Sequence, residues 1–196
     1  ESRSRDRSRD DGTSVMAILV VLALVLMATA TAAMVVPAGT QEYGVVSAEF
    51  ESENPTVIES GTSQEIEYVV PNAGLVPVYA YVEPASPGVD VEPQRLSVGS
   101  RGEASATVTL SAPDQTGYYR LFVVEHRYLA VLPSSVVDEL YRVHPWAPLV
   151  AINGLLGGGI AGLGLLLLRG EPARIRSRES RDKPPLYRRV LREIYR

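Results

Sequence analysis

The run VMAILVVLALVLMATATAAMVV, residues 15–36, contains no charged side chain and is followed directly by Pro37. A second uncharged run, residues 147–168, starts directly after Trp146 and stops before Arg169. Each run holds 22 residues, and about 20 apolar residues in a helix cross the hydrocarbon core of a bilayer. The sequence therefore predicts two transmembrane helices, 15–36 and 147–168, and excludes a single soluble globule.

The first run also has an alternative interpretation as a secretory signal, because small residues at positions 28–33 resemble a cleavage region. Its apolar core is longer than the roughly 7 to 15 residues of a signal, so we favour an uncleaved anchor. Since the chain begins with Glu1 rather than Met, we also expect it to be a processed or truncated piece of a longer protein.

Charge divides the chain into unlike parts. Residues 1–14 hold four basic and four acidic groups, residues 37–146 hold 5 basic and 15 acidic groups, and residues 169–196 hold 10 basic and 4 acidic groups. Because Arg and Lys resist translocation, we predict a two-pass protein of the cell membrane with a cytoplasmic leader (1–14), a basic cytoplasmic tail (169–196) and an acidic middle outside. Such acidity is typical of a halophilic exterior; an ordinary acidic ectodomain is the alternative.

Between Tyr43 and Glu125, apolar and polar residues alternate with a period of two, and turn residues interrupt the pattern at short intervals. Seven strands are predicted, beginning near residues 44, 56, 64, 76, 89, 103 and 118. The inward residues of three of them are predicted to be Val46, Ala48 and Phe50; Ile66, Tyr68 and Val70; and Ala104, Ala106, Val108 and Leu110.

The strings VPNAG (70–74), GVDVEP (88–93) and APDQTGYY (112–119) resemble the immunoglobulin-like modules of prokaryotic surface proteins. Tyr119 resembles a tyrosine corner with one extra residue in its turn. The predicted fold class is a membrane-anchored all-β protein, with an immunoglobulin-like sandwich of about seven strands at residues 37–131 between the two transmembrane helices.

Residues 132–146 are predicted to form an amphipathic helix that lies on the outer membrane surface, with Ser135 as its cap and Asp138 in its first turn. Tyr141 and Trp146 are the predicted membrane-interface residues. The predicted apolar face consists of Val136, Val137, Leu140, Val143 and His144. Because this linker is short and apolar, we expect a rigidly docked domain.

Small and basic residues mark two further contacts. Gly154, Gly158 and Gly162 form G-x-x-x-G steps that let another helix approach closely, and the first run, rich in Ala, is the predicted partner. In the tail, Leu186, Val190 and Ile194 follow at four-residue steps opposite several Arg residues. That pattern predicts a basic amphipathic helix for anionic lipid or for a partner.

No catalytic, cofactor-binding or metal site is predicted. The chain has no Cys, which excludes disulfides and thiolate chemistry. His126 and His144 lack the spacing of a helical metal site, and the carboxylates on alternating strand positions are interpreted as solvated groups, with cation binding as the alternative. We therefore expect a protein that is no enzyme, with the lipid bilayer as partner and without nucleic acid.

The strings PAGTQEYGVVSAEF (37–50), EHRYLAVLP (125–133) and YRVHPW (141–146) resemble the non-catalytic C-terminal region of haloarchaeal type I signal peptidases. In that family the catalytic Ser, followed directly by Met, lies in an upstream domain with a His and an Asp; here Val15 separates Ser14 from Met16. The resemblance implies an accessory part or relative of an archaeal signal peptidase in protein export, with the catalytic subunit or another membrane protein as partner. A cell-envelope binding or structural module unrelated to export is the alternative.

Overall fold

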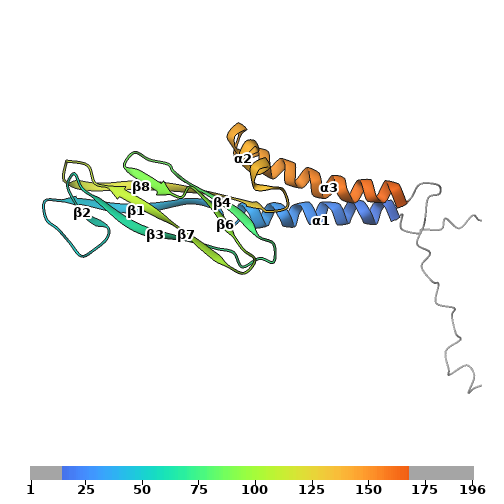
Figure 1. The fold of residues 1–196 in the computed structure, drawn as a ribbon, viewed down its shortest axis with the longest axis horizontal. Coiled ribbons are helices and arrows are strands. Elements are labelled where there is room, and N and C mark those ends of the chain that lie inside the picture. Colours follow the sequence, from blue (N-terminus) through green and yellow to red (C-terminus); the bar gives the residue numbers. More distant parts are fainter. Residues whose placement is uncertain (1–14, 168–196) are drawn as a thin grey trace, which may run out of the picture.

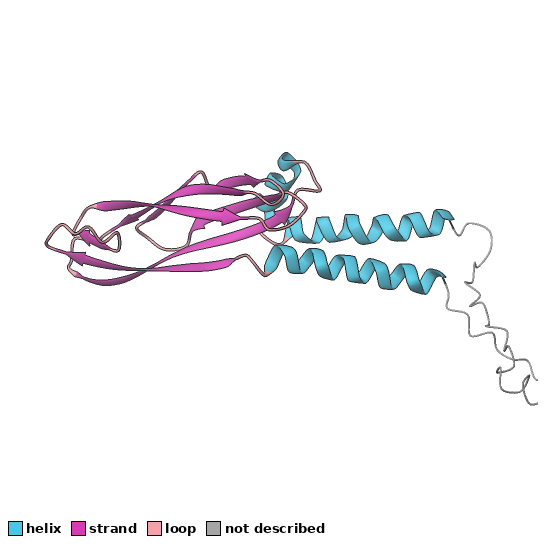
Figure 2. Ribbon diagram, turned by 90° about the horizontal axis from the view of Figure 1, so that it is seen from below, coloured by secondary structure: helices cyan, strands magenta, loops and turns pink. Residues whose placement is uncertain are grey.

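The computed structural model describes residues 15–167. Two long helices, α1 (Val15–Val35) and α3 (Ala147–Leu167), flank a strand domain and the short helix α2 (Ser134–Val143). Both long helices are apolar and long enough to cross a membrane. They lie side by side and extend from one end of the elongated strand domain (Figures 1 and 2).

Eight strands form a β-sandwich. They are β1 (Gly39–Ala48), β2 (Val57–Glu59), β3 (Ser63–Pro71), β4 (Val78–Pro84), β5 (Val89–Glu92), β6 (Arg95–Val98), β7 (Glu103–Ser111) and β8 (Gly117–Leu129). One sheet has the order β2-β1-β8-β4-β6 and the other β3-β7-β5. All paired strands are antiparallel except β1 and β2. The core between the sheets is made of aliphatic side chains such as Val45, Val70, Val108 and Val123, as the predicted immunoglobulin-like sandwich requires.

The strand that the sequence pattern missed is β6. It is only four residues long and follows β5 after Pro93 and Gln94, so the two appear as one interrupted segment. They belong to different sheets: β5 pairs with β7, and β6 pairs with β4. The chain therefore crosses from one sheet to the other at Pro93, which cannot donate a ladder hydrogen bond.

Of the three residues predicted to point inward around β1, Ala48 is buried as predicted, whereas the prediction is wrong for Val46 and for Phe50, which follows the strand. Val45 and Ser47 are buried, whereas Val46 is 39% exposed and Phe50 is 64% exposed. The Ser47 hydroxyl lies 2.9 Å from Ser60 Oγ and donates to the Pro113 carbonyl at 2.8 Å, so it is satisfied inside the sandwich. The other two alternations are confirmed, because Val70, Ala106, Val108 and Leu110 are buried.

The corner before β8 forms as the sequence predicts. The Tyr119 hydroxyl donates to the Gln115 carbonyl at 3.1 Å, which is the backbone bond that a tyrosine corner makes. The bond holds the turn between β7 and β8 against the start of β8.

The contact between α1 and α3 uses small residues other than those predicted. A Cβ at Gly157 would lie 2.5 Å from Met27 Sδ, and one at Gly164 would lie 2.8 Å from Leu19 Cδ1, whereas a Cβ at Gly154, Gly158 or Gly162 would meet nothing within 4 Å. The predicted contact of Gly154, Gly158 and Gly162 with the first helix is therefore wrong. Packing of these three residues on some other helix stays a prediction.

A polar side chain explains which face of α3 meets α1. Asn153 is 7% exposed, and its amide donates to Thr31 Oγ1 on α1 at 3.0 Å and to the Leu149 carbonyl at 3.0 Å. An amide between apolar helices needs such a partner. Gly157 follows Asn153 by four residues and lies on the same helical face, so this rotation of α3 places Gly157 against α1.

We predict that Gly157→Ile lowers the midpoint of thermal unfolding of the detergent-purified protein, because the new side chain must displace Met27 from the contact between the helices. Overpacking of this kind costs about 1–3 kcal/mol. Gly158→Ile is the matched control and is expected to leave the midpoint unchanged. Equal effects of the two substitutions would contradict this helix contact.

Candidate functional site at the junction of domain and helices

The outward face of the five-stranded sheet carries a group of aromatic residues where it meets the helices. Val78, Ala80 and Val82 of β4 point into the sandwich, so Tyr79 and Tyr81 point outward with the alternation of the strand. On β8, His126 lies opposite Tyr81 and Tyr128 lies opposite Tyr79. Helix α2 covers this face.

Tyrosine rings make the contact between α2 and the sheet. Tyr141 of α2 stacks on Tyr81 with ring centroids 4.1 Å apart and planes 19° apart. Tyr128 meets both rings edge-on, at 5.7 Å from Tyr81 and 5.9 Å from Tyr141. Val137 of α2 is fully buried in the same cluster. We call these four residues, with Asp138 and Arg95 described next, the α2 clamp.

The polar part of the α2 clamp centres on Asp138. Tyr81 Oη donates to one carboxylate oxygen at 2.5 Å, and Arg95 Nη1 donates to the other at 2.7 Å. Burial, together with the hydrogen bond to Asp138, raises the pKa of the Tyr81 hydroxyl far above its ordinary value, so this group stays a donor at physiological pH. The predicted cap is wrong: α2 begins after Pro133 without a side-chain cap, and Asp138 bonds to the sheet.

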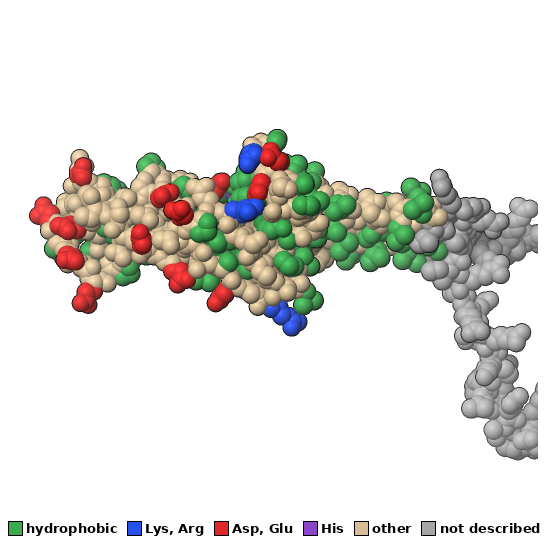
Figure 3. All heavy atoms as spheres, viewed as in Figure 1, with side chains coloured by type: hydrophobic (Ala, Val, Ile, Leu, Met, Phe, Trp, Pro, Cys, Tyr) green, Lys and Arg blue, Asp and Glu red, His purple; other side chains and the backbone are tan. Residues whose placement is uncertain are grey.

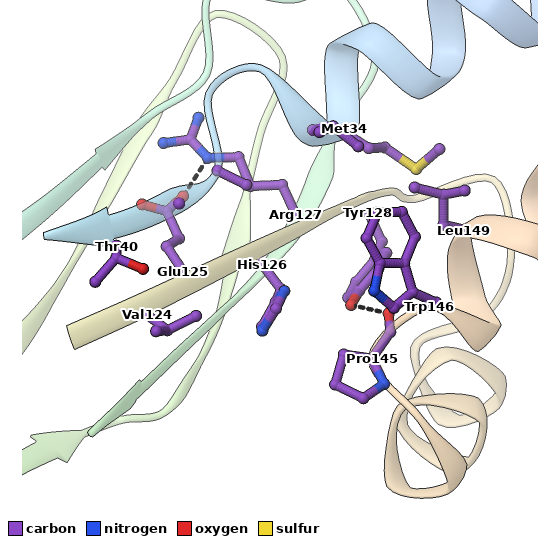
Figure 4. Close-up of a pocket in the computed structure, with 13 residues that line it drawn as sticks. Met34, Thr40, Val124, Glu125, His126, Arg127, Tyr128, Pro145, Trp146 and Leu149 are labelled. Atoms are coloured by element: carbon purple, nitrogen blue, oxygen red, sulfur yellow. Dashed lines mark hydrogen bonds and ion pairs between the residues drawn. The ribbon is translucent and has the colours of Figure 1, made fainter. Parts of the chain in front are cut away.

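Two further connections tie the sheet to the long helices. Only residues 36–38 separate α1 from β1, and Met34 near the end of α1 is buried among the aromatic residues and Ile152. The Tyr128 hydroxyl donates to the Pro145 carbonyl at 2.5 Å, just before α3 (Figure 4). The domain is therefore held at the α1 end, at the α3 start and through α2.

A hollow of about 350 Å³ opens between the end of α1, β8 and the start of α3. Its side chains are mostly apolar, with Met34, Trp146 and Leu149 on the helix side and Thr40 and His126 on the strand side (Figure 4). Such a lining fits an apolar group better than a charged one. Trp146 is 57% exposed at its rim.

An ion pair that the sequence reasoning missed lies inside the sandwich near this junction. Glu125 and Arg127 of β8 are 4% and 8% exposed, and Arg127 Nε donates to Glu125 (Figure 4). Arg127 Nη1 also donates to the Pro71 carbonyl at 2.6 Å, and Tyr68 Oη donates to Glu125 Oε2 at 2.7 Å. Burial and the bond to Glu125 raise the pKa of Tyr68. The available signal was two opposite charges at i and i+2, on the strand face that also holds Leu121 and Val123.

The other predicted site residues have different outcomes. Tyr141 of α2 packs on Tyr81 of the sheet, and its predicted place at the membrane interface stays a prediction. Its hydroxyl is buried without a hydrogen-bond partner among residues 15–167, and burial with the nearby Glu83 raises its pKa. The interface role of Trp146 stays a prediction. The tail residues Leu186, Val190 and Ile194 lie outside the described residues.

The comparisons find distant likenesses for the strand domain. No protein-family model matches the chain, and no curated protein matches it. Among solved structures, SSP-19, an MSP-domain protein like family member of Caenorhabditis elegans, matches with a TM-score of 0.33 and 13% identity, over 40% of this chain and 77% of that one. The ASH/PapD-like domain 7 of human CEP192 matches with a TM-score of 0.31 and 15% identity, over 46% of this chain and 73% of that one. The class of protein is an immunoglobulin-like β-sandwich of eight strands between two long apolar helices.

We predict that Asp138→Ala releases α2 from the sheet, because the substitution leaves Tyr81 Oη and Arg95 without their acceptor. The cost of such unpaired groups is about 1–3 kcal/mol. Faster hydrogen–deuterium exchange of residues 134–143 measures the release. Among residues 15–167, the neighbouring Glu139 pairs with Arg142 alone, and both side chains are 70% exposed. Glu139→Ala is therefore the control, and exchange as fast as in Asp138→Ala would contradict the clamp.

The buried pair Glu125–Arg127 gives a second prediction. Glu125→Leu alone leaves a buried guanidinium without its carboxylate, and removal of one partner of a buried pair costs about 3–5 kcal/mol of unfolding free energy. The double variant Glu125→Leu/Arg127→Met is expected to recover most of this loss in denaturant unfolding. A double variant less stable than either single variant would show that the pair is not coupled.

Proposed function

We propose that this protein is a two-span membrane protein that presents an acidic immunoglobulin-like domain outside the cell and has no catalytic role of its own. The helices support this orientation. α1 runs toward the sandwich and α3 runs away from it, so residues 15 and 167 lie at the same far end (Figure 1). The tail that follows, residues 169–196, has 10 basic and 4 acidic groups, which favours the cytoplasmic side.

The observation that carries the proposal is the fixed junction between domain and helices. A tethered binding module needs only a flexible linker. Here the α2 clamp, the bond from Tyr128 to Pro145 and the short segment 36–38 hold the sandwich at one height and one rotation above the helix pair. Such an arrangement suits a protein that positions a surface relative to the membrane.

The process that this positioning serves is proposed from the sequence resemblance. We propose that the chain is an accessory part or relative of an archaeal signal peptidase, with the sandwich beside a catalytic subunit that cleaves exported proteins outside the membrane. The exposed row of Gly154, Gly158 and Gly162 on α3 leaves room for a helix of that partner.

A second candidate, an envelope-binding module, is favoured by the far end of the sandwich. Acidic side chains gather there (Figure 3), and the loop after β1 exposes Phe50 to 64% between Glu49 and Glu51. An exposed aromatic residue in a loop is a common contact for another protein.

The orientation is tested with single cysteines, since the chain has none of its own. Phe50→Cys is expected to react with a membrane-impermeant maleimide in intact cells, whereas Ser180→Cys in the tail should react only after permeabilisation. The reverse pattern would overturn the two-span orientation.

The export role is tested separately. We expect the tagged full-length protein to copurify with a signal peptidase catalytic subunit, and its deletion to slow the processing of secreted precursors. Normal processing, together with capture of an envelope glycan or surface protein by wild type but not by Phe50→Ser, would favour the second candidate.

A further inference from the structure

A stiff loop with apolar tips lies at the helix end of the sandwich, away from α2. It consists of residues 72–77 between β3 and β4, and it exposes Leu75 to 73% and Val76 to 40%. Asn72 holds it: the amide donates to the carbonyls of Val76 and Gly99 at 2.9 Å each, and Oδ1 accepts from Gly74 N at 2.9 Å. The hydrogen bonds of the buried Asn72 thus fix the backbone of the loop that exposes Leu75.

The turn next to this loop carries a cation. Residues 99–102 connect β6 to β7, and Arg101 N donates to the Gly74 carbonyl at 2.9 Å. The residues 15–167 contain five Arg side chains, and four of them pair with carboxylates. Arg101 forms no ion pair within that range, although the domain around it is strongly acidic. The backbone of Arg101 therefore lies against the loop that exposes Leu75, and its guanidinium has no carboxylate partner among residues 15–167.

The place of these two turns in the molecule indicates what they face. They reach past the sandwich to the level where α1 ends and α3 begins, on the side of the helix pair opposite to α2 (Figure 1). Figure 3 shows basic groups near this end of the domain, whereas acidic groups gather at the far end. Val143 at the end of α2 and Trp146 directly before α3 are exposed to 80% and 57%.

We infer that residues 72–77 and 99–102 form a lipid-contact site on the outer membrane surface: Leu75 and Val76 enter the boundary between headgroups and acyl chains, and Arg101 binds the phosphate of an anionic lipid. The inference rests on the proposed two-span orientation. Apolar tips beside a cation suit this boundary, and basic side chains near the surface add attraction to anionic lipid. Because the helices already hold the turns at the bilayer, the effective lipid concentration is high.

The test uses single cysteines that carry an environment-sensitive fluorophore in the full-length protein, reconstituted into vesicles that contain spin-labelled lipids with the quencher near the headgroup. Leu75→Cys reports the site. Val36→Cys, 79% exposed directly after α1, is the positive control, and Phe50→Cys at the far end is the negative control. We expect quenching at positions 75 and 36 and none at 50. Quenching at 36 without quenching at 75 would overturn the lipid contact and leave the two-span proposal standing, whereas absence of quenching at 36 would overturn the two-span proposal.

The role of Arg101 is tested in the Leu75→Cys background. Its φ is +52°, a region that Asn tolerates, so Arg101→Asn keeps the turn. We expect this change to reduce quenching severalfold in vesicles with phosphatidylglycerol and to leave it unchanged in pure phosphatidylcholine. Arg142→Gln, at another exposed arginine, is the control. An equal loss with both arginine variants, or no loss with Arg101→Asn, would contradict phosphate binding by Arg101.

Discussion

The carboxylate of Asp138, held between Tyr81 and Arg95, is the constraint on which the relation between domain and helices depends. It joins α2, which continues into α3, to a strand face that would otherwise expose its tyrosines. The stacked rings of Tyr81 and Tyr141 add apolar contact area, and the bonds to the Asp138 carboxylate fix the position of α2 along the strand. Without this carboxylate, α2 would lose its polar bonds to the sheet, while the segment 36–38 and the bond from Tyr128 to Pro145 would still connect the sandwich to the long helices.

This constraint gives the helix end of the sandwich two different sides. On one side α2 covers the aromatic face, and on the other the loop 72–77 stays open with Leu75 exposed. The far end is acidic (Figure 3), and the segment 169–196 is basic in sequence. In the proposed two-span orientation, the helix end of the sandwich lies at the membrane and the acidic end lies away from it.

Local patterns in the sequence predict the elements but not all of their faces. Charge-free length predicts the two long helices α1 and α3, and alternation predicts seven of the eight strands. The short strand β6 is not predicted, because β5 and β6 look like one segment interrupted at Pro93, where the chain changes from one sheet to the other. Val46 and Gly158 each sit next to an equivalent residue, Val45 and Gly157, and a period of two or four cannot decide between neighbours. In the sequence, Glu125 and Arg127 resemble the charged residues of a solvated strand face. Only the fold shows that Tyr68 of β3 donates to Glu125.

The wrong faces have a common physical cause, which is the partner of one polar side chain. Ser47 bonds to Ser60 and to Pro113 inside the sandwich and turns Val46 outward. Asn153 bonds to Thr31 and turns Gly157, instead of Gly158, toward α1. Asp138 bonds to Tyr81 and turns Tyr141 toward the sheet. In each of the three elements, a side-chain hydrogen bond contributes about 0.5–1.5 kcal/mol and is made only with the face that the structure shows.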